Sequence, residues 1–151
     1  MKPAPLLELW LANQLVGALF EREFARIGLR PPNFALLSLL KVDGPATPTS
    51  LAATTGIAPT TLRTILNELA EKGLVRRRPH PSDGRSFVVE LSRKGLQTQL
   101  LGVPAVLALE EALGVGSSGQ RSGLTDQLRA LRRAAEAELA MPAKEHAEAA
   151  R

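Results

Sequence analysis

The sequence predicts a mainly α-helical fold that contains one small β-hairpin. Apolar residues recur at helical spacing along most of the 151 residues, and glycine or proline separates one run from the next. One stretch, residues 86–91, instead alternates apolar and polar residues as a strand does. Residues 74–78 can pair with it across a tip, residues 79–84, that is too polar and too rich in proline and glycine to be buried.

The composition allows one domain, or a compact pair of subdomains, with a true apolar core. Cysteine is absent, which excludes disulfides, thiolate metal sites and thiol redox chemistry within the chain. The formal net charge of +4 is small, but the basic residues are localised. They cluster around the expected hairpin, at Lys72, Arg76, Arg77, Arg78, Arg85, Arg93 and Lys94. This local excess of positive charge favours nucleic acid as a partner.

The N-terminal part predicts an amphipathic helix over residues 3–26. Its apolar arc is broadened by Leu6, Trp10 and Phe20, and an arc this wide on a terminal helix indicates burial against more than its own domain. Polar residues interrupt it, so it predicts neither a signal peptide nor a membrane span. We therefore expect a cytoplasmic protein without membrane contact. Residues 32–42 are nearly all apolar and predict a core helix.

Two further helices are predicted over residues 48–55 and 59–72, joined through a turn that contains Gly56. In the second of these, one face is apolar, with Leu62, Ile65, Leu66 and Leu69 at helical spacing. The opposite face carries short hydroxyls, an amide and a guanidinium, at Thr60, Thr61, Arg63, Thr64 and Asn67. Such groups bind base edges and phosphates. The pattern indicates a helix-turn-helix with a recognition helix, although an ordinary helical hairpin has similar spacing.

The hairpin that follows completes a winged helix-turn-helix, which we assign to residues 32–91. Two more helices are predicted, over residues 92–113 and about 120–139, and each carries a leucine seam. We therefore divide the single chain, residues 1–151, into this DNA-binding part and a helical dimerisation part formed by residues 3–28 and 92–140.

The wing residues also resemble a known family. Residues 83–95, Asp-Gly-Arg-Ser-Phe-Val-Val-Glu-Leu-Ser-Arg-Lys-Gly, are similar to the wing signature of MarR-type transcription regulators. Residues 69–77, Leu-Ala-Glu-Lys-Gly-Leu-Val-Arg-Arg, resemble the family's passage from recognition helix to wing, and the likeness in helix order extends over about residues 6–139.

The resemblance implies a homodimer with interlocked terminal helices. It also implies a repressor of nearby genes that is often released from DNA by a small phenolic or anionic effector. The sequence departs from the family pattern at Ala58, where a capping serine is commoner, and at Gly84, where a second arginine is frequent. Tyrosine, a common ligand donor, is absent.

The candidate DNA-binding residues lie on the two short helices and the wing: Thr49, Thr60, Thr61, Arg63, Thr64, Asn67, Arg78, His80 and Arg85. Arg85 at the wing tip suits a minor groove, Arg63 a guanine edge, and Asn67 an adenine or a phosphate. The alternative for each is a solvated surface group. Arg77 and Asp83 are expected to hold the wing together, because Asp83 can pair with Arg77 across the hairpin or hold Arg85 in position.

These observations favour a sequence-specific, double-stranded-DNA-binding transcription regulator, with a pseudo-palindromic operator whose half-sites lie about 10 bp apart. The alternative is a winged-helix module that docks proteins, although a basic wing tip argues against it. No catalytic constellation, phosphate loop or dinucleotide-binding motif appears, and two isolated histidines do not make a metal site. We expect no enzyme activity, no cofactor and no metal.

Overall fold

The computed structural model describes residues 4–115 and 118–141 as six helices and one hairpin. The helices are α1 (Pro5–Ala25), α2 (Pro31–Asp43), α3 (Pro48–Thr55), α4 (Pro59–Glu71), α5 (Arg93–Ala112) and α6 (Ser118–Ala140). The strands are β1 (Val75–Pro79) and β2 (Phe87–Leu91). The predicted mainly α-helical fold is confirmed, and the ends of the expected elements shift by at most two residues. Residues 1–3, 116–117 and 142–151 lie outside the described residues, so the parts of the predicted division of the chain that fall on them are not compared with the structure.

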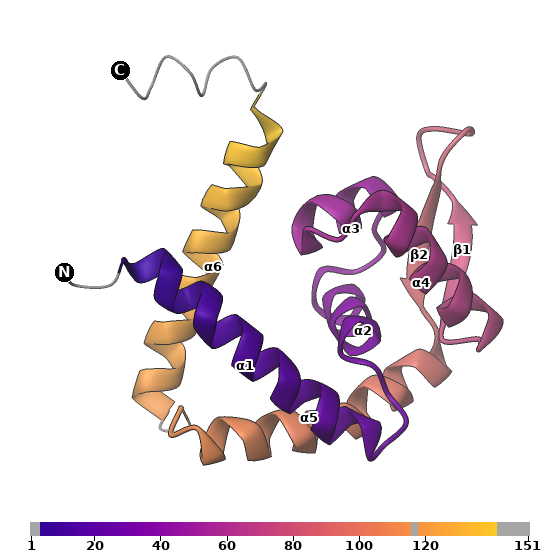
Figure 1. Cartoon of the computed structure of the whole chain (residues 1–151). Coiled ribbons are helices and arrows are strands. Elements are labelled where there is room, and N and C mark those ends of the chain that lie inside the picture. The colour runs from indigo at the N-terminus through magenta and orange to yellow at the C-terminus, as the bar shows by residue number, and fades with distance from the viewer. Residues whose placement is uncertain (1–3, 116–117, 142–151) are drawn as a thin grey trace.

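The winged helix-turn-helix, formed by α2, α3, α4, β1 and β2, lies on one side of the molecule (Figure 1). Its core is made by apolar side chains from all five elements, namely Leu36, Leu37, Leu40, Leu51, Leu62, Ile65, Leu66, Leu69, Leu74, Val75 and Val89. The apolar stripe predicted on residues 59–72 is therefore buried, which leaves the polar face of α4 directed to solvent.

The strands β1 and β2 are antiparallel, and Arg77 is opposite Val89 in their register. The pairing continues beyond the hairpin, because Ala46 exchanges two backbone hydrogen bonds with Val89, at 3.0 and 2.8 Å. This short bridge joins the segment before α3 to the wing, and the sequence pattern did not predict it. It fixes the position of the wing relative to the helix-turn-helix.

The other three helices, α1, α5 and α6, form an open frame beside the winged part (Figure 1). Helix α5 begins directly after β2, contacts both α1 and α2, and continues through Pro104. Helix α6 contacts α3. Among the described helices, none is both long enough and apolar enough to cross a membrane.

Candidate nucleic-acid interface

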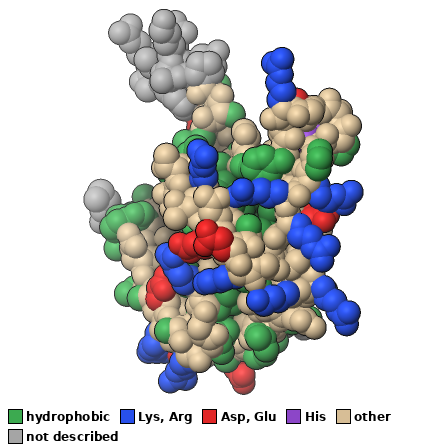
Figure 2. Space-filling model, turned by 90° about the vertical axis from the view of Figure 1, so that its right-hand side faces the viewer, with side chains coloured by type: hydrophobic (Ala, Val, Ile, Leu, Met, Phe, Trp, Pro, Cys, Tyr) green, Lys and Arg blue, Asp and Glu red, His purple; other side chains and the backbone are tan. Residues whose placement is uncertain are grey.

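Helix α4 presents its polar face at the surface of the winged part. Its buried stripe fixes its rotation, so that Thr60, Thr61, Arg63, Thr64 and Asn67 are all exposed. Lysine and arginine side chains are spread over this side of the molecule, and acidic side chains are few there (Figure 2). The polar face therefore lies within a positively charged surface, as phosphate contacts require.

The N-termini of the two short helices differ in their caps. Thr47 caps α3, because its hydroxyl accepts a hydrogen bond from the N–H of Ser50 at 3.1 Å. Thr49, in the first turn of α3, is exposed. In contrast, Ala58 supplies no side-chain cap to α4, as its residue type predicts. The first N–H groups of α4 therefore have no side-chain partner at the cap position and remain available to an anion.

The three consecutive arginines of β1 point to two sides of the hairpin. Arg77 is opposite the fully buried Val89 and so lies on the face that packs toward α4. Its guanidinium lies 5.3 Å from the centroid of the Phe87 ring and donates a hydrogen bond to Oδ1 of Asn67. Arg78 lies on the other face and forms an ion pair with Glu90 at 2.9 Å. Arg77 therefore contacts the recognition helix, whereas Arg78 lies on the solvent side of the hairpin.

At the wing tip, the carboxylate of Asp83 accepts a hydrogen bond from the backbone N–H of Arg85 at 3.0 Å. Of the two roles expected for Asp83, holding Arg85 therefore agrees with the structure. The expected pairing of Asp83 with Arg77 is not among the ion pairs of the described residues, and the side-chain partners of Arg77 are instead Asn67 and the Phe87 ring. The imidazole of His80 accepts the N–H of Ser82 at 3.2 Å, which turns the tip back on itself. The side chain of Arg85 is exposed.

The C-terminal end of α4 is fastened to the first turn of α5. The hydroxyl of Ser92 donates to the carbonyl of Gly73 at 2.7 Å and accepts from the N–H of Gly95 at 2.9 Å. Lys94 donates to the carbonyl of Lys72 at 2.7 Å. A Cβ atom at Gly95 would lie only 2.0 Å from the carbonyl oxygen of Leu74. We call Ser92, Lys94 and Gly95 the α4–α5 joint; the sequence predicted a helix that begins here, but not these contacts.

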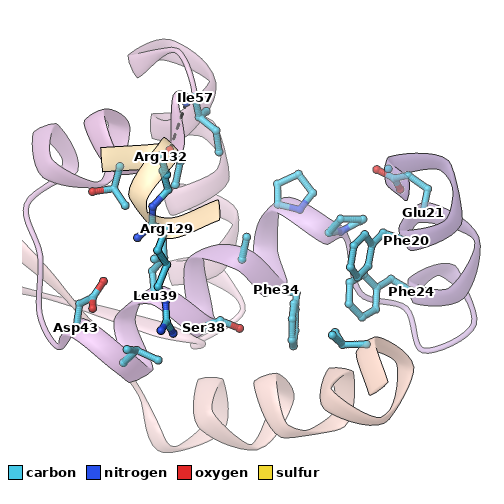
Figure 3. A pocket seen from close by; sticks show the side chains of 18 of the residues that line it. Phe20, Glu21, Phe24, Phe34, Ser38, Leu39, Asp43, Ile57, Arg129 and Arg132 are labelled. Atoms are coloured by element: carbon cyan, nitrogen blue, oxygen red, sulfur yellow. Dashed lines mark hydrogen bonds between the residues drawn. The ribbon is translucent and has the colours of Figure 1, made fainter. Parts of the chain in front are cut away.

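A cleft of about 1110 Å³ is lined by residues of α1, α2 and α6, together with the end of α3 and the turn that follows it. Along it, Phe20 stacks on Phe24 with ring centroids 5.5 Å apart, and the Phe34 ring packs at a tilt against Phe24 at 4.9 Å. Arg129, Arg132 and Arg133 of α6 also line it. The three rings lie on one side of the cleft, with Arg129 and Arg132 on the other (Figure 3). The cleft therefore combines an aromatic wall with positive charge, and the sequence alone did not locate it.

The aromatic wall of this cleft rests on α5. Gly102 packs against the Phe34 ring so closely that a Cβ atom there would lie 2.5 Å from it. Behind the wall, the buried Gln99 of α5 donates to the hydroxyl of Ser38 at 3.2 Å and accepts from Lys41 at 3.1 Å. The cleft is thus in contact with the same helix that carries the α4–α5 joint.

A recognition helix with an exposed polar face, a basic wing beside it and a helical frame behind it define a class of winged helix-turn-helix transcription regulators that bind DNA. Comparison with known proteins gives the family. The model of the MarR family matches residues 29–87. The chain is 30% identical to a probable transcriptional regulator from Pseudomonas aeruginosa of known crystal structure, over 84% of this chain and 96% of that one, with a TM-score of 0.67.

Two other proteins are similar to this chain, one in sequence and one in fold. The HTH-type transcriptional repressor NicR of Pseudomonas putida is 28% identical over 78% of this chain and 75% of its own length. The fold is similar to that of Bordetella bronchiseptica BpsR, whose DNA binding is regulated by 6-hydroxynicotinic acid. That likeness has a TM-score of 0.70 at 21% identity and covers 87% of this chain and 94% of BpsR. The chain belongs to the MarR family of transcription regulators, and its function is to regulate transcription by binding DNA.

Proposed function

We propose that this protein is a homodimeric repressor that binds a pseudo-palindromic operator and is released from it by a small aromatic anion. Family membership establishes the DNA-binding regulator. The dimer, the symmetry of the operator, the effector and the residues that contact DNA are the proposal. A repressor of this kind acts in the cytoplasm, where its operator is accessible.

The exposed polar face of α4 carries the proposal. It is the one side of the helix left free by the buried stripe, and it offers hydroxyl and guanidinium groups to a major groove. Arg63 would read a guanine edge, and Thr60, Thr61 and Thr64 would contact phosphates or thymine methyl groups. Thr49 would meet a phosphate at the start of α3, where helix N–H groups favour an anion.

The wing would contact the DNA backbone and the minor groove. Arg85 is exposed at the tip, and Asp83 holds its backbone, so the guanidinium is free to enter a narrow minor groove. His80 lies beside it in the same turn. Arg78 would reach a phosphate by exchanging its exposed ion pair with Glu90, which costs little because such pairs are weak in water.

The apolar residues left exposed on α1, α5 and α6 support a homodimer. The exposed fractions of Trp10, Leu15 and Leu101 are 57, 71 and 66%. Large apolar side chains in such number on one frame are costly in water, so a second copy covering them would be stabilised by their burial. A twofold dimer then presents two recognition helices, which is why a pseudo-palindromic operator is expected.

The cleft between α1, α2 and α6 suits a small aromatic anion. A planar ring can pack against Phe20, Phe24 and Phe34, and a carboxylate can reach the arginines of α6. Arg132 forms an ion pair with the half-buried Glu136 at 3.6 Å, too long for a hydrogen bond, so an anion can compete for it. A ligand releases DNA only if it binds better to the arrangement that DNA does not select.

The test is a titration of the dimer against duplexes recovered from a random pool, at several salt concentrations. We expect the logarithm of the affinity to fall with the logarithm of the salt concentration, by roughly 0.9 for each phosphate contact. Arg85→Glu should weaken binding by at least about tenfold while the circular dichroism and the dimer remain unchanged. Adding 2-hydroxybenzoate or 6-hydroxynicotinate should weaken wild-type binding.

Three results would contradict parts of this proposal separately. A flat salt response would exclude binding driven by phosphates. A single-copy footprint on non-symmetric DNA would exclude the twofold dimer. Unchanged affinity with every aromatic acid, together with no heat of binding in the absence of DNA, would exclude the effector class.

A further inference from the structure

Arg77 is held from two sides at the junction between the wing and the recognition helix. On the wing, its guanidinium lies over the Phe87 ring, 5.3 Å from the centroid. From α4, Oδ1 of Asn67 accepts its hydrogen bond. The cation–π contact with the ring and the hydrogen bond to the amide act on the same guanidinium, so each limits how far it can turn away from the other. Arg77 therefore has a fixed relation to the side chain of Asn67.

The chemistry of this contact decides which way the Asn67 amide faces. A guanidinium has N–H donors and no acceptor, so only the oxygen of the amide can face it. The NH₂ group of Asn67 must then point away from Arg77. An asparagine without such a partner can turn its amide either way and present an acceptor or a donor.

Asn67 also belongs to the face of α4 that is left free for DNA. It follows Thr60, Arg63 and Thr64 at helical spacing, and all four side chains are exposed. In the major groove, guanine offers two acceptors, N7 and O6, whereas adenine offers an acceptor and a donor. Bidentate reading of adenine by asparagine uses both the oxygen and the NH₂ group of the amide.

We propose that Arg77 sets the base preference of Asn67, so that this asparagine selects guanine over adenine. With the oxygen of its amide turned toward Arg77, Asn67 presents its NH₂ group to the base edge, and the two N–H donors of that group match the two acceptors of guanine. Arg77 is a positioning residue that acts through Asn67, and Asn67 makes the base contact. This inference depends on the proposed DNA-binding face, and it replaces the adenine contact that the residue type alone suggested.

Arg78 provides a matched control on the same strand. It has the same charge and the next position, but it lies on the opposite face of the hairpin, where it pairs with Glu90 at 2.9 Å. Removing Arg78 therefore lowers the positive charge of the wing by the same amount without changing the surroundings of Asn67.

The experiment selects bound duplexes from a random pool with the wild-type protein and with four variants, Arg77→Ala, Arg77→Lys, Arg78→Ala and Asn67→Ala. The wild type should prefer guanine over adenine at one position of each half-site by at least about tenfold. Arg77→Ala should reduce that preference to about threefold or less, and Arg77→Lys, which still donates to the amide oxygen, should restore it. Arg78→Ala should lower affinity for all sequences alike and keep the preference.

Each outcome decides something. If Arg77→Ala keeps the full preference for guanine, or if Asn67→Ala keeps it, the inference is overturned. If Arg77→Ala does not fold, Arg77→Met replaces it in the experiment: methionine keeps an aliphatic stem over Phe87 but has no N–H donor, so the preference for guanine should fall in the same way. A wild-type pool without any enriched half-site would contradict the proposed function and the inference with it. An enriched site whose preferences ignore position 77 contradicts the inference alone.

Discussion

The winged part and the frame of α1, α5 and α6 bury their apolar residues to very different extents. In the winged part, Leu36, Leu37 and Leu69 have no exposed surface. In the frame, Leu15 and Leu139 are 71 and 80% exposed. The winged part has completed its core within one chain, whereas the frame has not. The comparison indicates that one region is stabilised by its own packing, whereas the other leaves an apolar surface that the proposed dimer would cover.

The largest expected effect comes from opening the completed core. Leu37→Ala should reduce the free energy of unfolding by about 2–5 kcal/mol, because a fully buried side chain leaves a cavity in packed surroundings. Leu15→Ala removes as many atoms from an exposed site and should instead weaken dimer formation. Denaturant unfolding measures the loss at Leu37, and sedimentation at several protein concentrations measures the loss at Leu15, since only a weakened interface shifts the monomer–dimer equilibrium of the folded protein. Equal, concentration-independent losses would contradict the division.

A smaller effect is expected at the α4–α5 joint, where the two regions meet. Gly95→Ala should destabilise the protein by about 1–3 kcal/mol, because the new methyl group overlaps the carbonyl of Leu74 and the backbone must shift. Gly123→Ala in α6 is the matched control: nothing lies within 4 Å of a Cβ atom there, and alanine favours a helix by up to about 1 kcal/mol over glycine. Thermal unfolding of both variants measures the difference, and a tolerated Gly95→Ala would show that the joint is loose.

The smallest effect is expected at the start of the recognition helix. Ala58→Ser should raise the free energy of unfolding by about 0.5–1 kcal/mol, because a serine hydroxyl can accept from the N–H groups that Ala58 leaves uncapped. Ala58→Val cannot accept a hydrogen bond and should give no gain. Urea unfolding of the two variants checks the sign, and equal stability of both would show that these N–H groups are already satisfied.

Much of the candidate interface could be predicted from local pattern. The buried stripe of α4 follows from leucine and isoleucine at helical spacing, and the same spacing assigns Thr60, Arg63 and Asn67 to the opposite face. The alternation of side chains along a strand likewise accounts for Arg77 and Arg78 pointing to different sides. The partner of Asp83 was predicted only as one of two, Arg77 or Arg85, because an acidic residue in a basic loop has more than one basic residue within reach.

Other features could not be predicted, since they depend on segments far apart in the chain. Asn67 and Arg77 meet only because the turn after α4 brings β1 back along the helix. The pairing of Ala46 with Val89 joins residues on either side of the whole helix-turn-helix. No periodicity reports such contacts. The aromatic cleft is a similar case. Phe20 and Phe34 lie on apolar helix faces that the sequence pattern assigns to a core, and only the position of α6 leaves a cleft beside them.

The sequence by itself determined the helices, the wing and the gathering of positive charge around it, because backbone preference and amphipathic spacing act between near neighbours. Only the tertiary structure decided which partner each polar side chain has, and so which groups Asn67 and the arginines of α6 can offer to a ligand. Hydrogen bonds are short and directional, and a change of a few ångströms in how the elements pack exchanges one partner for another.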